Sequence, residues 1–161
     1  MQKFLSALHA AALAATSFGC ASTHAAEVKT PEQKAVMTVV NVFVVSFNAG
    51  DTAKALEMCT DEMSIIDEFP PHEWHGAGAL KKWLADFDSN ARQEGISDSI
   101  VTCKAPRHLD VKGDYAYVVV PSDYTWKQKG QPMMESDSLF TFALHKEKAG
   151  WKITGWSWSN N

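Results

Sequence analysis

The sequence has few cysteines and few basic residues. It has 3 cysteines among 161 residues, far below the density of a disulfide-bonded scaffold. None of them forms a C-x-x-C pair, so the usual spacing of a structural zinc site is missing. The chain carries 15 basic and 19 acidic residues, a formal charge of -4, without a cluster of Lys or Arg. This charge balance argues against a nucleic-acid partner.

Short catalytic and cofactor-binding motifs are also missing. The sequence contains no G-x-S-x-G nucleophile elbow, no phosphate-binding loop and no dinucleotide fingerprint. We therefore expect no cofactor. The composition, 45% apolar and 21% charged, is that of an ordinary globular protein, and the length predicts a single domain.

The N-terminus has the pattern of a secretory signal peptide. Lys3 supplies a basic start, the apolar stretch "FLSALHAAALAATSF" follows, and the small-residue run "GCASTHAAE" comes next. The apolar stretch is too short to span a membrane. We assign residues 1–26 to a signal peptide, with cleavage after Ala25 or Ala26, and residues 27–161 to the mature domain.

Export predicts a periplasmic or secreted protein without a membrane anchor. A lipid anchor at Cys20 is disfavoured, because Phe18 is bulky and no aliphatic residue stands three positions before Cys20. Processing leaves Cys59 and Cys103 in an oxidising compartment. A disulfide between them and two half-buried free thiols are both compatible with the sequence.

Three helices are expected in the first half of the domain. Thr30 and Pro31 form a helix start, and apolar residues then recur at helical spacing until Gly50. Asp51 caps a second, short helix. Residues 76–93 form the third, which stops at Gly95.

Strands dominate the second half. A short strand, "EMSIIDEF", precedes the third helix. After it come "DSIVTCKAPRHLDV", "DYAYVVVPSDYTW", "SDSLFTFALHK" and "WKITGWSWS", separated by hairpin turns. This order predicts an α+β fold: three N-terminal helices packed on a strongly curved, mostly antiparallel sheet.

Several segments resemble a known superfamily. "FNAGD", "WHGAGALKKWL", "KGDYAYVVV" and "FTFALHKEKAGWKI" are similar, in order and spacing, to the SnoaL-like, ketosteroid-isomerase-like proteins of the nuclear transport factor 2-like superfamily. The resemblance covers residues 30–159. It implies a cone with an internal pocket and a homodimer. It does not name a reaction, because this fold carries many functions.

Asp67 is the first candidate for catalysis. The resemblance places it where isomerases of the superfamily carry a general base, and a half-buried carboxylate there would have a raised pKa. The alternative is a carboxylate that accepts backbone hydrogen bonds in the turn before Pro70. The same resemblance places Phe43 and Ser138 at the positions of the isomerase oxyanion donors. Steroid isomerisation is not expected, since Phe cannot donate and Ser is a weaker donor.

The histidines offer two further hypotheses. His72, Glu73 and His75 could form a metal site with Asp67, but they follow two prolines and lie on no expected helix. We interpret them as a solvated loop over the rim of the cone and expect no metal. His108 could complete an acid–base pair with Asp67 or make a hydrogen bond at the surface.

Aromatic residues indicate a pocket. Alternation along residues 114–126 places Tyr124 and Trp126 on the same face as three apolar residues and Ser122. These side chains either line a cavity or fill the core. We take the following residues as candidates for ligand binding: Phe43, Asp67, Trp83, Tyr124, Trp126, Ser138 and Phe140.

The last strand carries a separate aromatic pair. Strict alternation places Trp151 and Ile153 on one face and Trp156 and Trp158 on the other. The second pair would then form an exposed patch suited to dimer contact, unless a bulge reverses the faces.

Three functions follow from these observations. The first is binding of a small, mostly apolar or aromatic molecule in the pocket. The second is a lyase- or isomerase-type enzyme with Asp67 as base and His108, Tyr124 or Ser138 as acid. The third is a protein-interaction module that uses the outer face of the sheet.

Overall fold

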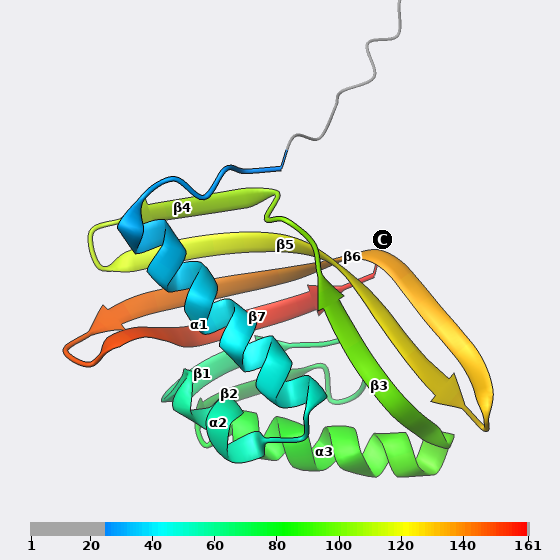
Figure 1. Cartoon of the computed structure of the whole chain (residues 1–161). Coiled ribbons are helices and arrows are strands. Elements are labelled where there is room, and N and C mark those ends of the chain that lie inside the picture. The colour runs from blue at the N-terminus through cyan, green and yellow to red at the C-terminus, as the bar shows by residue number, and fades with distance from the viewer. Residues whose placement is uncertain (1–24, 161) are drawn as a thin grey trace, which may run out of the picture.

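A computed structural model describes residues 25–160. Most of the predicted signal peptide, together with Cys20, lies outside this range. The described part has the predicted α+β fold, in which three helices pack on a curved sheet (Figure 1). No helix in it is long and apolar enough to cross a membrane.

The first helix, α1 (Pro31–Asn48), begins at a complete capping box. The Thr30 hydroxyl accepts a 3.1 Å hydrogen bond from the Gln33 backbone N–H, and the Gln33 side chain accepts one from the Thr30 backbone N–H. The run "VVNVFVV" inside α1 has strand propensity, but the cap and the burial of one helical face outweigh it. For α1, the capping residues therefore predict the secondary structure better than the strand propensity of the valine-rich run does.

The other two helices are bounded by their own caps. Asp51 accepts a 3.0 Å hydrogen bond from the Lys54 backbone N–H at the start of α2 (Thr52–Glu57). Gly78 and Gly95 flank α3 (Ala79–Glu94), both in the left-handed conformation that glycine adopts without strain. The predicted helix boundaries therefore hold to within three residues.

The sheet has the strand order β2-β1-β7-β6-β5-β3, and β4 also pairs with β5. All pairings are antiparallel except that of β1 with β7. The strands are β1 (Cys59–Ile66), β2 (Glu73–Ala77), β3 (Ile96–Cys103), β4 (His108–Lys112), β5 (Tyr115–Gln128), β6 (Gln131–Glu147) and β7 (Gly150–Ser159).

Two segments differ from the sequence-based prediction. The expected loop over the rim contains β2, which pairs antiparallel with β1. The expected strand over residues 98–111 is divided into β3 and β4, and both pair with the long strand β5. The chain leaves the sheet around Pro106, which cannot donate a hydrogen bond to the ladder.

The core lies between α1 and the sheet (Figure 1). Val36 and Val40 of α1 are fully buried, as are the sheet residues Val118, Phe142 and Ile153. Full burial of such side chains stabilises the fold by roughly 1.5–3 kcal/mol each. The core thereby fixes the position of α1 relative to the sheet.

Bulges change which side chains face the core. Between β6 and β7 the register passes from Leu144 opposite Ile153 to Ala143 opposite Gly155, so Thr154 is an extra residue. Beyond this bulge Trp156 pairs with Phe142 and faces inward, with 5% of its surface exposed. The expected outward patch of Trp156 and Trp158 is therefore wrong, because one extra residue reverses the faces of a strand.

Candidate functional site

A cavity of about 220 Å³ lies between α1, α3 and the sheet. An apolar cavity of roughly 150 Å³ is already large enough to bind benzene, so this one has room for a small organic molecule. Ten aromatic side chains of residues 25–160 line it: Phe43, Phe47, Phe69, Trp83, Phe87, Tyr124, Trp126, Phe140, Trp156 and Trp158.

The aromatic wall is built from both layers of the fold. On the helical side, Trp83 stacks on Phe87 with ring centroids 5.2 Å apart. Trp156 of β7 meets Trp83 edge-on at 4.9 Å. On the far side Tyr124 stacks on Trp126 at 4.7 Å. Offset and edge-on arrangements are the favoured geometries of aromatic pairs, so these contacts join the rings of both layers into one wall.

Asp67 follows β1 and lines this cavity. Its Oδ2 atom accepts a 2.8 Å hydrogen bond from Nε1 of Trp83, and its Oδ1 atom accepts one of 2.7 Å from the Glu68 backbone N–H. Burial raises the pKa of Asp67, and the negative charge of Glu135 raises it further, while the two hydrogen bonds and His72 act in the opposite direction. Asp67 therefore accepts a backbone hydrogen bond, as the turn interpretation expects, and also lines the cavity.

Glu135 of β6 is a second carboxylate at the cavity. Its Oε1 atom accepts a 2.9 Å hydrogen bond from Nε1 of Trp158 and a short one from the Ser138 hydroxyl. Ser122 of β5 pairs with Ser138 of β6, and Tyr124 pairs with Glu135. Two steps along β5 therefore correspond to three steps along β6, so β6 has one extra residue between Glu135 and Ser138. This bulge brings Glu135 to the same face as Tyr124.

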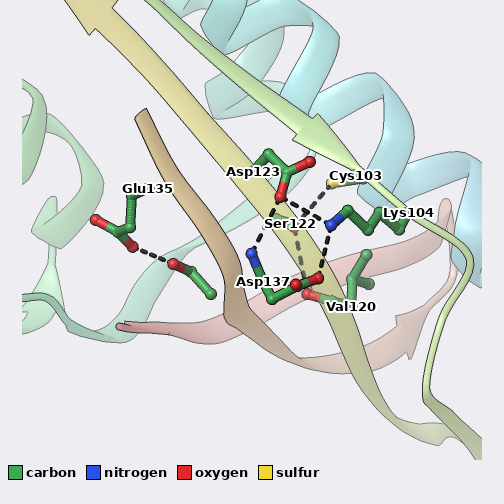
Figure 2. A network of polar contacts seen from close by, with 8 residues as sticks. Cys103, Lys104, Val120, Ser122, Asp123, Glu135 and Asp137 are labelled. Atoms are coloured by element: carbon green, nitrogen blue, oxygen red, sulfur yellow. Dashed lines mark hydrogen bonds and ion pairs between the residues drawn. The ribbon is translucent and has the colours of Figure 1, made fainter. Parts of the chain in front are cut away.

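Polar contacts on the other side of β6 hold the bulge. Asp137 has a positive φ of 60°, and its backbone N–H donates to Asp123 over 3.0 Å. Lys104 pairs with both carboxylates, at 2.8 Å from Asp123 and 2.6 Å from Asp137. Figure 2 shows Glu135 on the opposite side of the β6 ribbon from this network. The network therefore fixes the strand geometry that turns Glu135 into the cavity.

Glu68 adds a third carboxylate to the cavity lining. Its Oε1 atom accepts a 2.6 Å hydrogen bond from the Asn160 backbone N–H. Burial and the neighbouring Glu135 raise the pKa of Glu68. Among the described residues that line the cavity there is no Lys, Arg or His, so every formal charge on this wall is negative.

Two indole N–H groups of the lining have no acceptor among residues 25–160. They are Nε1 of Trp126 and Nε1 of Trp156, and both are buried. A buried donor without a partner costs about 1–3 kcal/mol. Such unsatisfied groups are rare in folded proteins and often mark functional sites.

Six of the seven ligand-binding candidates line the cavity: Phe43, Asp67, Trp83, Tyr124, Trp126 and Phe140. Ser138 does not. Its side chain is fully buried and donates to Glu135, so it positions that carboxylate instead. In the structure Ser138 therefore lies behind Glu135 and not in the cavity wall.

His108 does not pair with Asp67. It is exposed on β4, and its ring packs against that of Tyr117 at 5.6 Å. Strand β4 pairs along β5 at the end away from Tyr124, and His108 does not line the cavity. In the structure His108 therefore forms no acid–base pair with Asp67.

The residues considered for a metal site point in different directions. Glu73 and His75 are exposed on β2, where they contact each other at 3.2 Å. His72 contacts the backbone oxygen of Asp67. In the described part of the chain no group of three His, Cys, Asp or Glu side chains is arranged to hold a metal ion.

Cys59 and Cys103 are free thiols in the structure. Burial raises the pKa of Cys59 to about 12, and it also raises the pKa of Cys103. A thiol with so high a pKa is a poor nucleophile at neutral pH. Neither cysteine lines the cavity.

Sequence reasoning missed several residues of the site. Trp156 and Trp158 line the cavity but were not among the ligand-binding candidates, because strict alternation along the last strand places them on the outer face. Glu135 was not among them either, since it precedes the expected strand over residues 136–146. Phe47 and Phe87 could have been included, since they share helical faces with Phe43 and Trp83. For Glu135 the sequence contains no comparable signal.

Comparison with known proteins agrees with this architecture. The family model described as "SnoaL-like domain" matches residues 36–160. A search of curated proteins gives no significant match.

Solved structures show the same fold at low sequence identity. A nuclear transport factor 2-like superfamily protein from Salmonella enterica has a TM-score of 0.65 and 16% identity, covering 79% of this chain and 89% of its own. A ketosteroid isomerase-like protein from Erwinia carotovora has a TM-score of 0.59 and 18% identity, and the match covers 82% of this chain and 98% of that protein. An NTF2-like protein with a cystatin-like fold from Novosphingobium aromaticivorans has a TM-score of 0.64 and 12% identity, and the match covers 80% of this chain and 81% of that protein.

The family match extends from α1 to the last residue that the structure describes, and it includes every element that lines the cavity. The predicted resemblance is thereby confirmed. This chain belongs to the SnoaL-like domain family.

Proposed function

We propose that this protein is exported and binds a small, largely apolar or aromatic molecule in its cavity. The observation that carries the proposal is the cavity of about 220 Å³ with ten aromatic side chains in its wall. Pockets of this kind, mostly apolar with a few polar groups, are the usual design for small ligands. Burial of apolar ligand surface supplies roughly 25 cal/mol per Å² toward binding.

Two adjacent valines of α1 allow a matched test. Val44 lines the cavity and is 5% exposed, whereas its neighbour Val45 does not line the cavity and is 66% exposed. Val44→Phe should fill part of the cavity and abolish binding, and Val45→Phe should leave binding unchanged. Binding is followed by tryptophan fluorescence and thermal shift with a panel of monocyclic aromatic compounds. The proposal fails if no compound binds the wild type, or if both variants bind equally well.

A second candidate function is proton transfer with Asp67 as general base. It is supported by the raised pKa of Asp67 and by its position at the cavity. Of the acids considered from the sequence, Tyr124 alone lines the cavity, and its hydroxyl lies 2.9 Å from the Ser99 hydroxyl.

This second candidate is tested by proton exchange. An enzyme of this kind should exchange the α-protons of an aryl ketone such as phenylacetone for deuterium in D₂O, as followed by NMR. Asp67→Asn should lose the exchange, and Asp61→Asn, an exposed change on strand β1 that precedes Asp67, should keep it. Equal rates in wild type and Asp67→Asn would exclude the general-base role.

Export and dimerisation are separate parts of the proposal. Cleavage after Ala25 or Ala26 should give a mature protein that starts at Ala26 or Glu27, as read by N-terminal sequencing after expression of the full chain. Light scattering of that protein should give twice the mass of one chain. The interaction-module hypothesis has lost its main support, because Trp156 is buried in the cavity wall.

A further inference from the structure

We propose that the ligand is a cation: a small aromatic or apolar molecule that carries an organic ammonium group. This inference rests on the proposed function and narrows the class of ligand. It comes from the combination of acidic and aromatic side chains around one cavity.

The charges of the cavity favour a cation. Asp67, Glu68 and Glu135 all line it, and no basic residue among the described lining residues offsets them. The negative charge of Glu135 raises the pKa of both Asp67 and Glu68, which means that the three carboxylates repel one another when ionised. A ligand cation would relieve this repulsion, and a ligand anion would increase it.

The carboxylates are oriented by neutral donors. Asp67 accepts from the indole of Trp83, and Glu135 accepts from the indole of Trp158 and from Ser138. Neutral donors fix the geometry of a carboxylate without cancelling its charge. Each carboxylate can accept about four hydrogen bonds, so acceptor capacity remains for an ammonium group.

The walls suit an organic cation. The face of an aromatic ring attracts a cation within about 6 Å, and tryptophan does so most strongly. Four tryptophans line this cavity: Trp83, Trp126, Trp156 and Trp158. A methylene or aryl body attached to the ammonium group would bury its apolar surface against the same rings.

A metal ion fits these residues less well. In residues 25–160 no three His, Cys, Asp or Glu side chains converge on a point where a metal could bind. A hard cation such as Ca²⁺ needs six to eight oxygen ligands at about 2.3–2.6 Å. An ammonium group on an organic body needs only one or two carboxylates and an apolar wall.

Three probes of similar size and different charge test the inference at pH 7 and low salt. Benzylammonium is a cation, benzyl alcohol is neutral and benzoate is an anion. Affinities are measured by isothermal titration calorimetry and by tryptophan fluorescence. We expect benzylammonium to bind at least tenfold more tightly than benzyl alcohol, and benzoate to bind most weakly.

Glu135→Gln is the informative variant. Both hydrogen bonds to Glu135 end on Oε1, so an amide oxygen can accept them and the cavity keeps its shape. This variant should lose about tenfold in affinity for benzylammonium and little for benzyl alcohol. Glu147→Gln, an exposed change at the β6–β7 turn, removes the same charge outside the cavity and should have no effect.

The outcomes separate the two proposals. If benzyl alcohol binds as tightly as benzylammonium, or if Glu135→Gln weakens both probes equally, the ligand is not recognised by its charge, and the proposed function stands without this inference. If none of the three probes binds, this inference fails, and the proposed function fails as well once the wider panel of monocyclic aromatic compounds also shows no binding. Glu68→Gln serves as a second variant should Glu135→Gln fail to fold, and the same selective loss is expected.

Discussion

Trp83 donates its indole N–H to Oδ2 of Asp67 over 2.8 Å, and this bond joins the end of β1 to the middle of α3. The bond favours the ionised carboxylate, but burial has the larger effect and leaves the pKa of Asp67 raised above its ordinary value of 3.8. The folded state therefore holds a proton on Asp67 at a pH where the unfolded state has released it.

The first prediction concerns the pH dependence of stability. Between pH 3.8 and the raised pKa of Asp67 the unfolded state binds fewer protons at this residue, so the contribution of Asp67 to the free energy of unfolding falls as pH rises. Asp67→Asn lacks this proton, so the stability of the wild type relative to the variant should decrease over the same range and then level off. Urea unfolding of both proteins from pH 3 to pH 8 measures it. A constant or rising difference would contradict the raised pKa.

The second prediction concerns the bulge that orients Glu135. Asp137 has a φ of 60°, which β-branched residues rarely adopt. Asp137→Val should lower the free energy of unfolding by about 1–3 kcal/mol, whereas Asp137→Gly should change it by less than about 1 kcal/mol. Ser136→Val, at the exposed neighbouring position, serves as the control in the same denaturant series. Equal effects of all three substitutions would show that the bulge is not under this backbone constraint.

The third prediction concerns the contact between β7 and β1. A Cβ atom on Gly155 would lie 2.9 Å from the backbone oxygen of Ser64, closer than real Cβ contacts. Gly155→Ala should therefore cost about 1–3 kcal/mol of stability and should weaken probe binding, because the adjacent Trp156 lines the cavity. Ser159→Ala, near the exposed end of β7, should leave both quantities unchanged. If Gly155→Ala is as stable as the wild type, β1 and β7 can move apart at this point without a measurable cost.

The fourth prediction concerns the thiols of Cys59 and Cys103. Because burial raises the pKa of Cys59 to about 12, the folded protein should react very slowly at this position with an alkylating reagent at pH 8. In denaturant without reductant, Cys59 and Cys103 should both be alkylated, as counted by mass spectrometry. If neither cysteine is alkylated under those conditions, the two form a disulfide, and the free thiols of the structure are contradicted.

Much of the fold could be predicted because its signals are local. The capping box at Thr30 and the glycine stop at Gly95 depend on residues a few positions apart. The resemblance to the superfamily placed Asp67 at a pocket, and Asp67 lines the cavity of the structure. The split of residues 98–111 into β3 and β4 was not predicted, since it depends on pairing with two separate parts of β5.

The sequence by itself determined the element order, the capped helices and the apolar faces of the regular strands, because periodicity and caps act over short distances. Only the tertiary structure decided that Glu135, Trp156 and Trp158 face the cavity. One extra residue in β6 and one in β7 reverse the side-chain alternation. Residues distant in sequence meet each bulge: Lys104 and Asp123 pair beside the first, and Gly155, directly after the second, pairs with Ser64 of β1. The acidic and aromatic character of the site depends on these two register shifts.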